Sequence, residues 1–137
     1  MAVQKRVSAD DFAEMVQVAS LCMHLVDTKQ WDRLSDVFTE DAVYDGKATI
    51  TQKVAEGVSG IAALWSSLKM GVHYSTDLIV VDVGDAGKTA TTVSKWMSTP
   101  DNDKIRTGVY RDEWSKTAAG WRIRRRVNTI TKPDPGM

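Results

Sequence analysis

The sequence of 137 residues predicts a single α+β domain in which helices pack on one face of a strongly curved antiparallel sheet. Hydrophobic residues recur with helical spacing in the first half of the chain. From His73 onward the pattern changes to a period of two, which is typical of strands. Turn-forming residues at 84–87 and 100–103 separate the alternating runs, so consecutive long strands are expected there.

Three helices are expected before residue 70. The first follows Ser8, which can cap it together with Asp11, and its apolar residues from Phe12 to Val26 keep the i, i+3, i+4 rhythm of an amphipathic helix. Apolar residues at the same spacings predict two shorter helices, at 31–38 and 59–68. The strands are expected at residues 42–45, 48–54, 73–83, 88–97, 105–114 and 121–130.

Composition narrows the classes of function. The 18 basic and 18 acidic residues cancel, so the excess of positive charge that usually accompanies nucleic-acid binding is missing. No stretch approaches the roughly 18 apolar residues that a membrane span requires, and the first residues contain no apolar segment of signal-peptide length. Cys22 is the only cysteine, so no intramolecular disulfide can form. We expect a cytoplasmic protein without nucleic-acid or membrane partners.

Familiar metal and cofactor motifs do not occur in the sequence. Two histidines and one cysteine, without HxH or ExxH spacing, give no plausible set of metal ligands. Neither a phosphate-binding glycine loop nor a nucleophile elbow is found. We therefore expect chemistry that needs no metal and no cofactor.

Asp27 and His73 form the candidate catalytic pair. At 100° per residue, Asp27 lies about 80° from the centre of the first helix's apolar face, whereas His24 lies about 140° away. A carboxylate at a helix C-terminus is unfavourable unless it has a donor partner, and His73 at a strand start can supply one. A carboxylate that accepts from one imidazole nitrogen makes the other nitrogen a better base. Each residue also has a structural alternative: a loop cap for Asp27 and a satisfied polar residue for His73.

Four segments carry a resemblance to a known family: LVDTKQWDRLSDVFTEDAVYDG, HYSTDLIV, GVYRDEW and GWRIRRR. From about Phe12 to Arg126, the chain resembles the SnoaL-like branch of the nuclear transport factor 2-like superfamily, which contains scytalone dehydratase, bile-acid dehydratase and hexachlorocyclohexane dehydrochlorinase. The resemblance implies a cone-shaped curved sheet, packed against the three helices and enclosing a pocket. It also implies that Asp27 and His73 act there as a pair.

The resemblance further implies an arginine that reaches the pocket from the last strand. Counting from Trp121 places it at Arg126, although strict alternation puts these two residues on opposite faces. Arg126 therefore requires a bulge, and Arg124 or Arg125 is the alternative. Cys22 occupies the position at which some members carry a Tyr or Lys that positions the leaving group, so the resemblance leaves the particular reaction open.

Aromatic residues are the candidates for contact with a substrate. Tyr44 and Tyr110 could each supply a phenol as a proton donor or an oxyanion stabiliser, and Trp31, Trp65 and Trp96 could line an apolar pocket. All five also have the ordinary alternative of packing in the core.

The sequence therefore predicts a cofactor-independent lyase of the dehydratase type, which uses His/Asp acid–base catalysis. Its substrate would be small and hydrophobic, for example a polyketide, an aromatic or a steroid-like compound. An isomerase, a polyketide cyclase, an epoxide hydrolase or a non-catalytic ligand-binding module are alternatives on the same fold. The broad outer face of long strands predicts a homo-oligomer, a dimer or a trimer.

Overall fold

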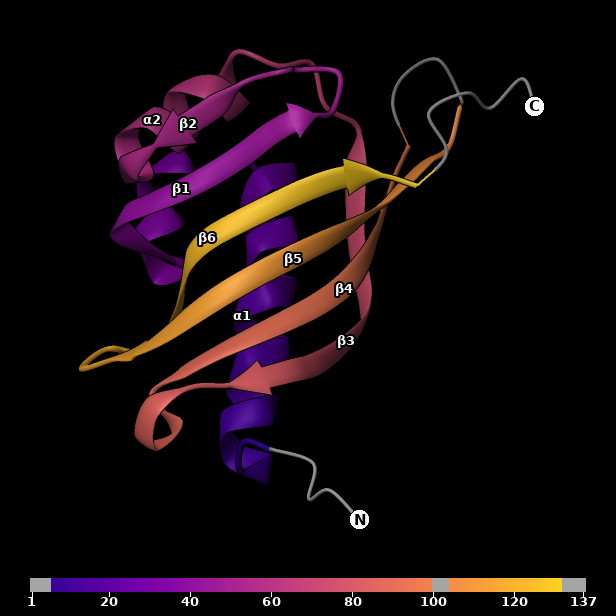
Figure 1. Cartoon of the computed structure of the whole chain (residues 1–137). Helices are drawn as coiled ribbons and strands as arrows, with labels where there is room; N and C mark the ends of the chain where they lie inside the picture. Colours follow the sequence, from indigo (N-terminus) through magenta and orange to yellow (C-terminus); the bar gives the residue numbers. More distant parts are fainter. Residues whose placement is uncertain (1–5, 100–103, 132–137) are drawn as a thin grey trace.

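The computed structural model describes residues 6–99 and 104–131 (Figure 1). The helices are α1 (Ala9–Asp27), η1 (Trp31–Asp36), α2 (Gly57–Ser66) and the short 3₁₀ turn η2 (Asp85–Gly87). The strands are β1 (Phe38–Ala48), β2 (Val54–Glu56), β3 (Val72–Val83), β4 (Thr89–Thr99), β5 (Arg106–Thr117) and β6 (Gly120–Ile130). Helix α1 crosses one face of the curved sheet, where it contacts β3 and β6, and α2 covers β1. The predicted α+β fold is confirmed.

The six strands form one sheet in the order β2-β1-β6-β5-β4-β3. All neighbouring strands are antiparallel except β1 and β6, which run parallel. The antiparallel sheet expected from the sequence is therefore a mixed one, because β6 returns to β1 only after a long connection instead of a hairpin. The sheet is not closed, since β2 and β3 remain its two edges.

Strand β1 continues where the sequence predicted a break at Gly46. A Cβ atom at this position would lie 2.8 Å from Thr51 Oγ1 and 2.9 Å from the Tyr44 ring, so the close approach of the following turn requires glycine. The chain then turns at 49–52 and pairs back through the short strand β2. Gly46 therefore accommodates the packing of a neighbouring turn within one long strand.

Two irregularities decide which residues face the helices. In β3 the pairing with β4 shifts between Thr76 and Ile79, and Asp77 adopts a positive φ of 56°. In β6 the pairing with β5 shifts so that Arg124 is the additional residue. Each of these bulges reverses the alternation of faces beyond it.

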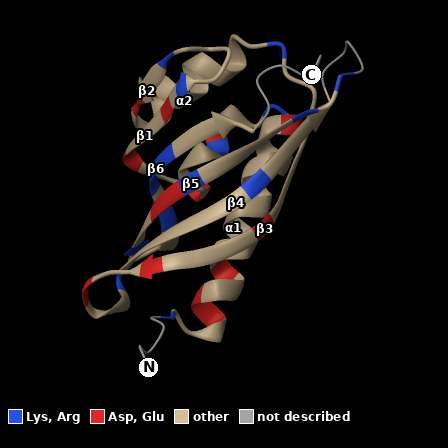
Figure 2. Ribbon diagram, turned by 45° about the vertical axis from the view of Figure 1, so that its right-hand side comes forward, with Lys and Arg blue, Asp and Glu red and all other residues tan. Residues whose placement is uncertain are grey.

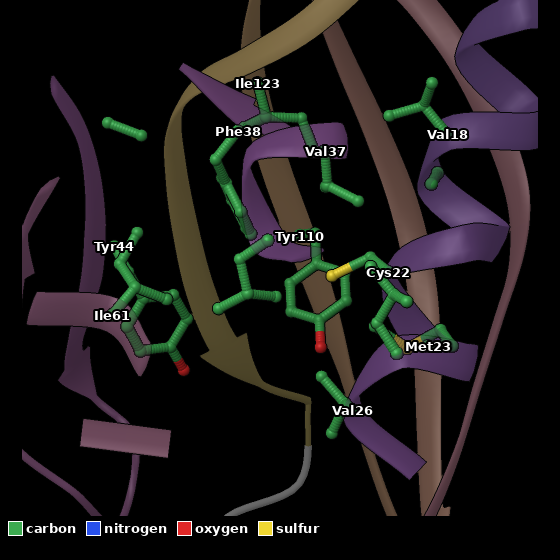
Figure 3. Close-up of a cluster of buried hydrophobic side chains, with 14 of the residues drawn as sticks. Val18, Cys22, Met23, Val26, Val37, Phe38, Tyr44, Ile61, Tyr110 and Ile123 are labelled. Carbon is green, nitrogen blue, oxygen red and sulfur yellow. The ribbon is translucent and has the colours of Figure 1, made fainter. Parts of the chain in front are cut away.

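Helix α1 supplies most of the apolar surface opposite the sheet. Ser8 caps it as expected, because its Oγ accepts a hydrogen bond from the Asp11 backbone N–H at 3.0 Å. Buried residues of α1 face the aromatic residues of the sheet, as Figure 3 shows for Val18, Cys22, Met23 and Val26 opposite Tyr110. Phe12 and Val16, assigned to the same apolar face from the sequence, remain exposed, whereas Val18 and Leu25 are buried. Within the described residues, no helix has the length and apolarity to cross a membrane.

Candidate active site

A cavity of about 240 Å³ lies between α1, α2 and the sheet. Its apolar wall includes Met23, Val26, Trp65, Leu68, Met70, Trp96 and Ile130, and its polar lining includes Tyr44, His73, Ser98, Arg106, Tyr110 and Asn128. An apolar cavity of about 150 Å³ can hold benzene. The cavity is therefore large enough for a small molecule of one or two rings.

Asp27 and His73 meet at the wall of this cavity. Asp27 is the last residue of α1, and both of its carboxylate oxygens accept from the backbone N–H of His73, at 3.1 and 3.3 Å. His73 Nδ1 lies 3.3 Å from Asp27 Oδ1, and the two side chains are only 13% and 24% exposed, respectively. His73 lines the cavity and Asp27 does not, so Asp27 supports the imidazole from behind. With Nδ1 facing the carboxylate, Nε2 is the nitrogen that remains for a ligand.

A chain of hydrogen bonds orients Tyr44. Trp96 Nε1 donates to Asn128 Oδ1 at 2.7 Å, which fixes the amide so that Asn128 Nδ2 donates to the Tyr44 hydroxyl at 2.9 Å. Because that hydroxyl already accepts a bond, its own proton remains for donation. Burial raises the pKa of Tyr44, and the hydrogen bond from Asn128 only partly opposes this effect, so the phenol stays protonated near neutral pH.

Tyr110 supplies a second phenol to the same cavity. Within residues 6–99 and 104–131 its hydroxyl has no hydrogen-bond partner, although the residue is almost fully buried. Burial raises the pKa of Tyr110 far above its ordinary value, so this hydroxyl is also a donor. Figure 3 shows the hydroxyl groups of Tyr44 and Tyr110 pointing in the same direction. Each of the two hydroxyl groups can therefore donate to a ligand in the cavity.

Gly108 makes room for the indole that anchors this network. It lies opposite Trp96 in the β4–β5 pair, and a Cβ atom at Gly108 would lie only 2.3 Å from the Trp96 ring. The absence of a side chain allows the indole to lie across β5 and reach Asn128 on β6. A glycine in a central strand thus has a specific role in shaping the cavity.

Arg126 is the inward arginine of β6, because the bulge at Arg124 places Arg126 and Trp121 on the same face, and both are fully buried. Arg124 and Arg125 instead pair with Glu113, at 3.0 and 3.7 Å. The structure therefore selects Arg126 among the three candidates.

Arg126 nevertheless lies beneath the cavity and is not among the residues that line it. Its Nε and Nη2 bind the two carboxylate oxygens of Asp112 at 2.8 and 2.9 Å, and Nη1 lies 3.6 Å from Cys22 Sγ. The guanidinium also lies 3.8 Å from the centre of the Tyr110 ring. Burial lowers the pKa of Arg126 and is the largest single effect, but Asp112, through its charge and its hydrogen bonds, acts together with Cys22 and Tyr110 to raise the pKa on balance, so the charge is retained. Arg126 thus supports Tyr110, and the structure does not bring it to the ligand space.

Of the three tryptophan residues predicted to contact a substrate, two line the cavity and one does not. Trp65 lines the cavity and packs edge-on against Tyr44, with ring centres 5.2 Å apart. Trp96 lines it as well. Trp31 is half-buried against the core at the start of η1 and lies outside the cavity lining.

Sequence reasoning missed six polar residues that line the cavity, which are Thr49, Thr51, Lys69, Ser98, Arg106 and Asn128. Asn128 follows Arg126 by two residues in β6, so a strand that directs Arg126 inward must direct Asn128 inward as well. The sequence therefore held a signal for Asn128. The described residues contain no group of three or more His, Cys, Asp or Glu side chains arranged to hold a metal ion.

The curved mixed sheet with helices over one face and an apolar cavity between them is an α+β architecture, and its fold is similar to that of solved proteins described as NTF2-like or as having a cystatin-like fold. Residues 7–127 match the model of the SnoaL-like domain, and the chain belongs to this family. No curated protein matches the sequence significantly.

Solved structures agree with this assignment. A candidate aromatic ring hydroxylase from Novosphingobium aromaticivorans shares 28% identity and a TM-score of 0.78, over 93% of this chain and 94% of that one. An NTF2-like protein with a cystatin-like fold from the same organism has 22% identity and a TM-score of 0.76, with 93% and 86% coverage. A candidate scytalone dehydratase, also from that organism, has 17% identity and a TM-score of 0.67, with 90% and 83% coverage. The last two structures have low sequence identity to this chain, so their similarity shows a shared fold and nothing more.

Proposed function

We propose that the protein is a cofactor-independent lyase, most simply a dehydratase, that acts on a small hydrophobic molecule. The observation that carries this proposal is the contact between Asp27 and His73 at the wall of an apolar cavity. In the proposed reaction, His73 Nε2 removes a proton from carbon. The electrons of that C–H bond form a C=C bond while the neighbouring C–O bond breaks, and the departing hydroxide takes up the proton from the His73 imidazolium and leaves as water.

Asp27 orients the imidazole and stabilises the imidazolium that forms when His73 takes up the proton. Tyr44 and Tyr110 would donate to a substrate carbonyl oxygen as negative charge develops on it, which is the role of an oxyanion hole. The apolar wall limits water around the base and strengthens these interactions. Each group thus has a separate task in one proton-transfer step.

The alternatives fit the cavity less well or differ only in the product. An epoxide hydrolase needs paired carboxylates around a water molecule, whereas no described residue of the cavity lining is acidic. A binding module without catalysis would not need an imidazole supported by a carboxylate at an open cavity. Isomerases and cyclases would use the same base, so the product must distinguish them from a dehydratase.

The test uses a panel of small ring compounds that carry a hydroxyl group β to a carbonyl. In D₂O, wild-type protein should release the conjugated product, which absorbance detects. Alternatively, it should place deuterium on the substrate carbon, which NMR detects. The substitutions His73→Gln and Asp27→Asn should each reduce the rate by about a hundredfold or more.

His24→Gln is the matched control, because His24 is exposed on α1 and should leave the rate unchanged. Thermal unfolding of each variant should show that the fold is retained. Full turnover in the folded His73→Gln and Asp27→Asn variants would rule out the proposal. Deuterium placed on carbon with an isomerised product, and without loss of water, would favour an isomerase.

A further inference from the structure

Three polar side chains form a row across the sheet at the cavity. His73 in β3 pairs directly with Ser98 in β4, and Ser98 pairs directly with Arg106 in β5. All three line the cavity. Neighbouring strands lie about 4.8 Å apart, so the backbone of Arg106 is roughly 10 Å from that of His73, with Ser98 between them. The cavity therefore holds a cationic group at a fixed distance from the proposed base.

The guanidinium of Arg106 differs from those of the arginines in β6. Arg124, Arg125 and Arg126 each form an ion pair with an acidic side chain, and Arg122 donates hydrogen bonds to the backbone carbonyls of Ser35 and Trp121. Arg106 is half-buried, and its guanidinium makes no hydrogen bond or ion pair with any residue in the described ranges 6–99 and 104–131. Partly buried charges are normally paired, because removal from water is costly.

No described residue that lines the cavity together with Arg106 is acidic. Figure 2 shows acidic residues along the N-terminal turns of α1 and mostly basic residues at the opposite end of the molecule. Ser98 is buried and adds a hydroxyl next to Arg106. A guanidinium beside a hydroxyl, without a protein carboxylate, is suited to a planar anion.

We propose that the substrate of this cavity carries a carboxylate, which Arg106 binds through its guanidinium and Ser98 through its hydroxyl. The apolar body of the substrate extends from there along Trp96 and Trp65, and it passes His73. The substrate class is thus a small hydrophobic carboxylic acid, with a ring that fits about 240 Å³. The reaction that this acid undergoes rests on the proposed function, whereas the binding of its carboxylate by Arg106 and Ser98 does not depend on it.

Binding of benzoate and of its neutral analogue benzamide tests the proposal, measured by titration calorimetry at pH 8, where an ordinary imidazole is neutral. Wild-type protein should bind benzoate about tenfold more tightly than benzamide, because bonds to a charged acceptor are the stronger ones. Arg106→Gln should remove this preference, because it should lower the affinity for benzoate about tenfold and leave the affinity for benzamide unchanged. Arg111→Gln is the matched control, because Arg111 lies on the same strand and is exposed.

Three results would overturn the proposal: no benzoate binding at millimolar concentration, equal affinities for benzoate and benzamide, or equal losses in Arg106→Gln and Arg111→Gln. Phenyl phosphate forms a further arm, and tighter binding of this compound than of benzoate would also contradict a carboxylate site. Thermal unfolding verifies that Arg106→Gln is folded. No turnover enters this experiment, so its failure leaves the proton-transfer test of His73 and Asp27 intact, and the reverse also holds.

Discussion

The ion pair of Arg126 and Asp112 is a buried charge pair beneath the floor of the cavity. Both side chains are fully buried, and their two hydrogen bonds run side by side. The guanidinium faces the ring of Tyr110, so the pair holds that phenol in place from below. The sequence placed Arg126 inward only on condition of a bulge, and the bulge is present at Arg124. Arg126 contacts Tyr110, however, instead of the ligand space, because Asp112 shares the inward face of β5 and binds it there.

Asp112→Asn should lower the free energy of unfolding by about 3–5 kcal/mol, because it leaves the Arg126 guanidinium buried without an opposite charge. Urea denaturation of the purified protein measures this change. Glu113→Gln is the control, since the Glu113 side chain is partly exposed, at 36%, and its ion pairs with Arg124 and Arg125 should contribute about 1 kcal/mol or less. Equal effects of the two substitutions would contradict a special role of the buried pair.

At the level of the elements, bulges decide which residues of β3 are turned toward the helices and which toward solvent. Uniform alternation predicted His73, Ser75, Asp77 and Ile79 on one side. In the structure, His73 and Ser75 are half-buried whereas Ile79 is 56% exposed, because Asp77 is inserted between them with φ of 56°. Aspartate tolerates this left-handed conformation better than most residues.

Periodicity therefore predicted where the strands lie but not their irregularities. The strands at 73–83, 88–97, 105–114 and 121–130 were predicted to within a few residues, since each alternating run is long. The bulges and the parallel β1–β6 pair depend on contacts between distant segments, which a local pattern does not contain. The pairing of Asp27 with His73 was predicted from their places at the ends of regular elements together with the family resemblance. The sequence also held a signal for Asn128, but the hydrogen bonds that link Trp96, Asn128 and Tyr44 join three different strands, which a local pattern does not contain.

The first turn of α1 is held on the β5–β6 hairpin by Asp11. Its Oδ1 accepts from Trp121 Nε1 at 2.9 Å and lies 3.0 Å from Lys116 Nζ. The hydrogen bond from Trp121, followed by that from Lys116, lowers the pKa of Asp11 from its ordinary value of 3.8. A lowered pKa in the folded state means that the ionised form stabilises the fold, and that this contribution is lost as the pH falls through the folded pKa.

Asp11→Asn should therefore lower the thermal stability at pH 7, and the difference from wild type should shrink as the pH falls below about 4. Melting temperatures measured from pH 7 to pH 3 provide the test. Asp10→Asn is the control, because Asp10 is exposed on the same turn. A difference that is constant with pH would mean that the Asp11 charge has no part in docking α1.

For the whole molecule, the outer face of β3 and β4 carries an unusual amount of apolar surface. Val72, Tyr74, Ile79, Val81 and Met97 are all exposed there, and Tyr74 pairs directly with Met97. Strand β3 is also an edge of the sheet. Contiguous exposed apolar residues of this kind commonly mark an interface between proteins.

We expect a second copy of this chain, or two, to cover this face in a dimer or a trimer. Sedimentation velocity at micromolar concentration should give the mass of the oligomer for wild type. The double substitution Tyr74→Lys and Ile79→Lys should give the 15.2 kDa monomer, because it places two charges in an apolar interface. A folded double variant with the mass of wild type would exclude this face as the interface, and a monomeric wild type would exclude the oligomer itself.

The main-chain amide of His73 has a consequence for repeated turnover. It binds Asp27 at a position that does not depend on whether the imidazole carries a proton. In the proposed reaction the ring gains and returns a proton in every cycle, while the carboxylate keeps its peptide anchor throughout. In that reaction the carboxylate would stay aligned with the ring from one round to the next, so the geometry of the pair would not have to be rebuilt.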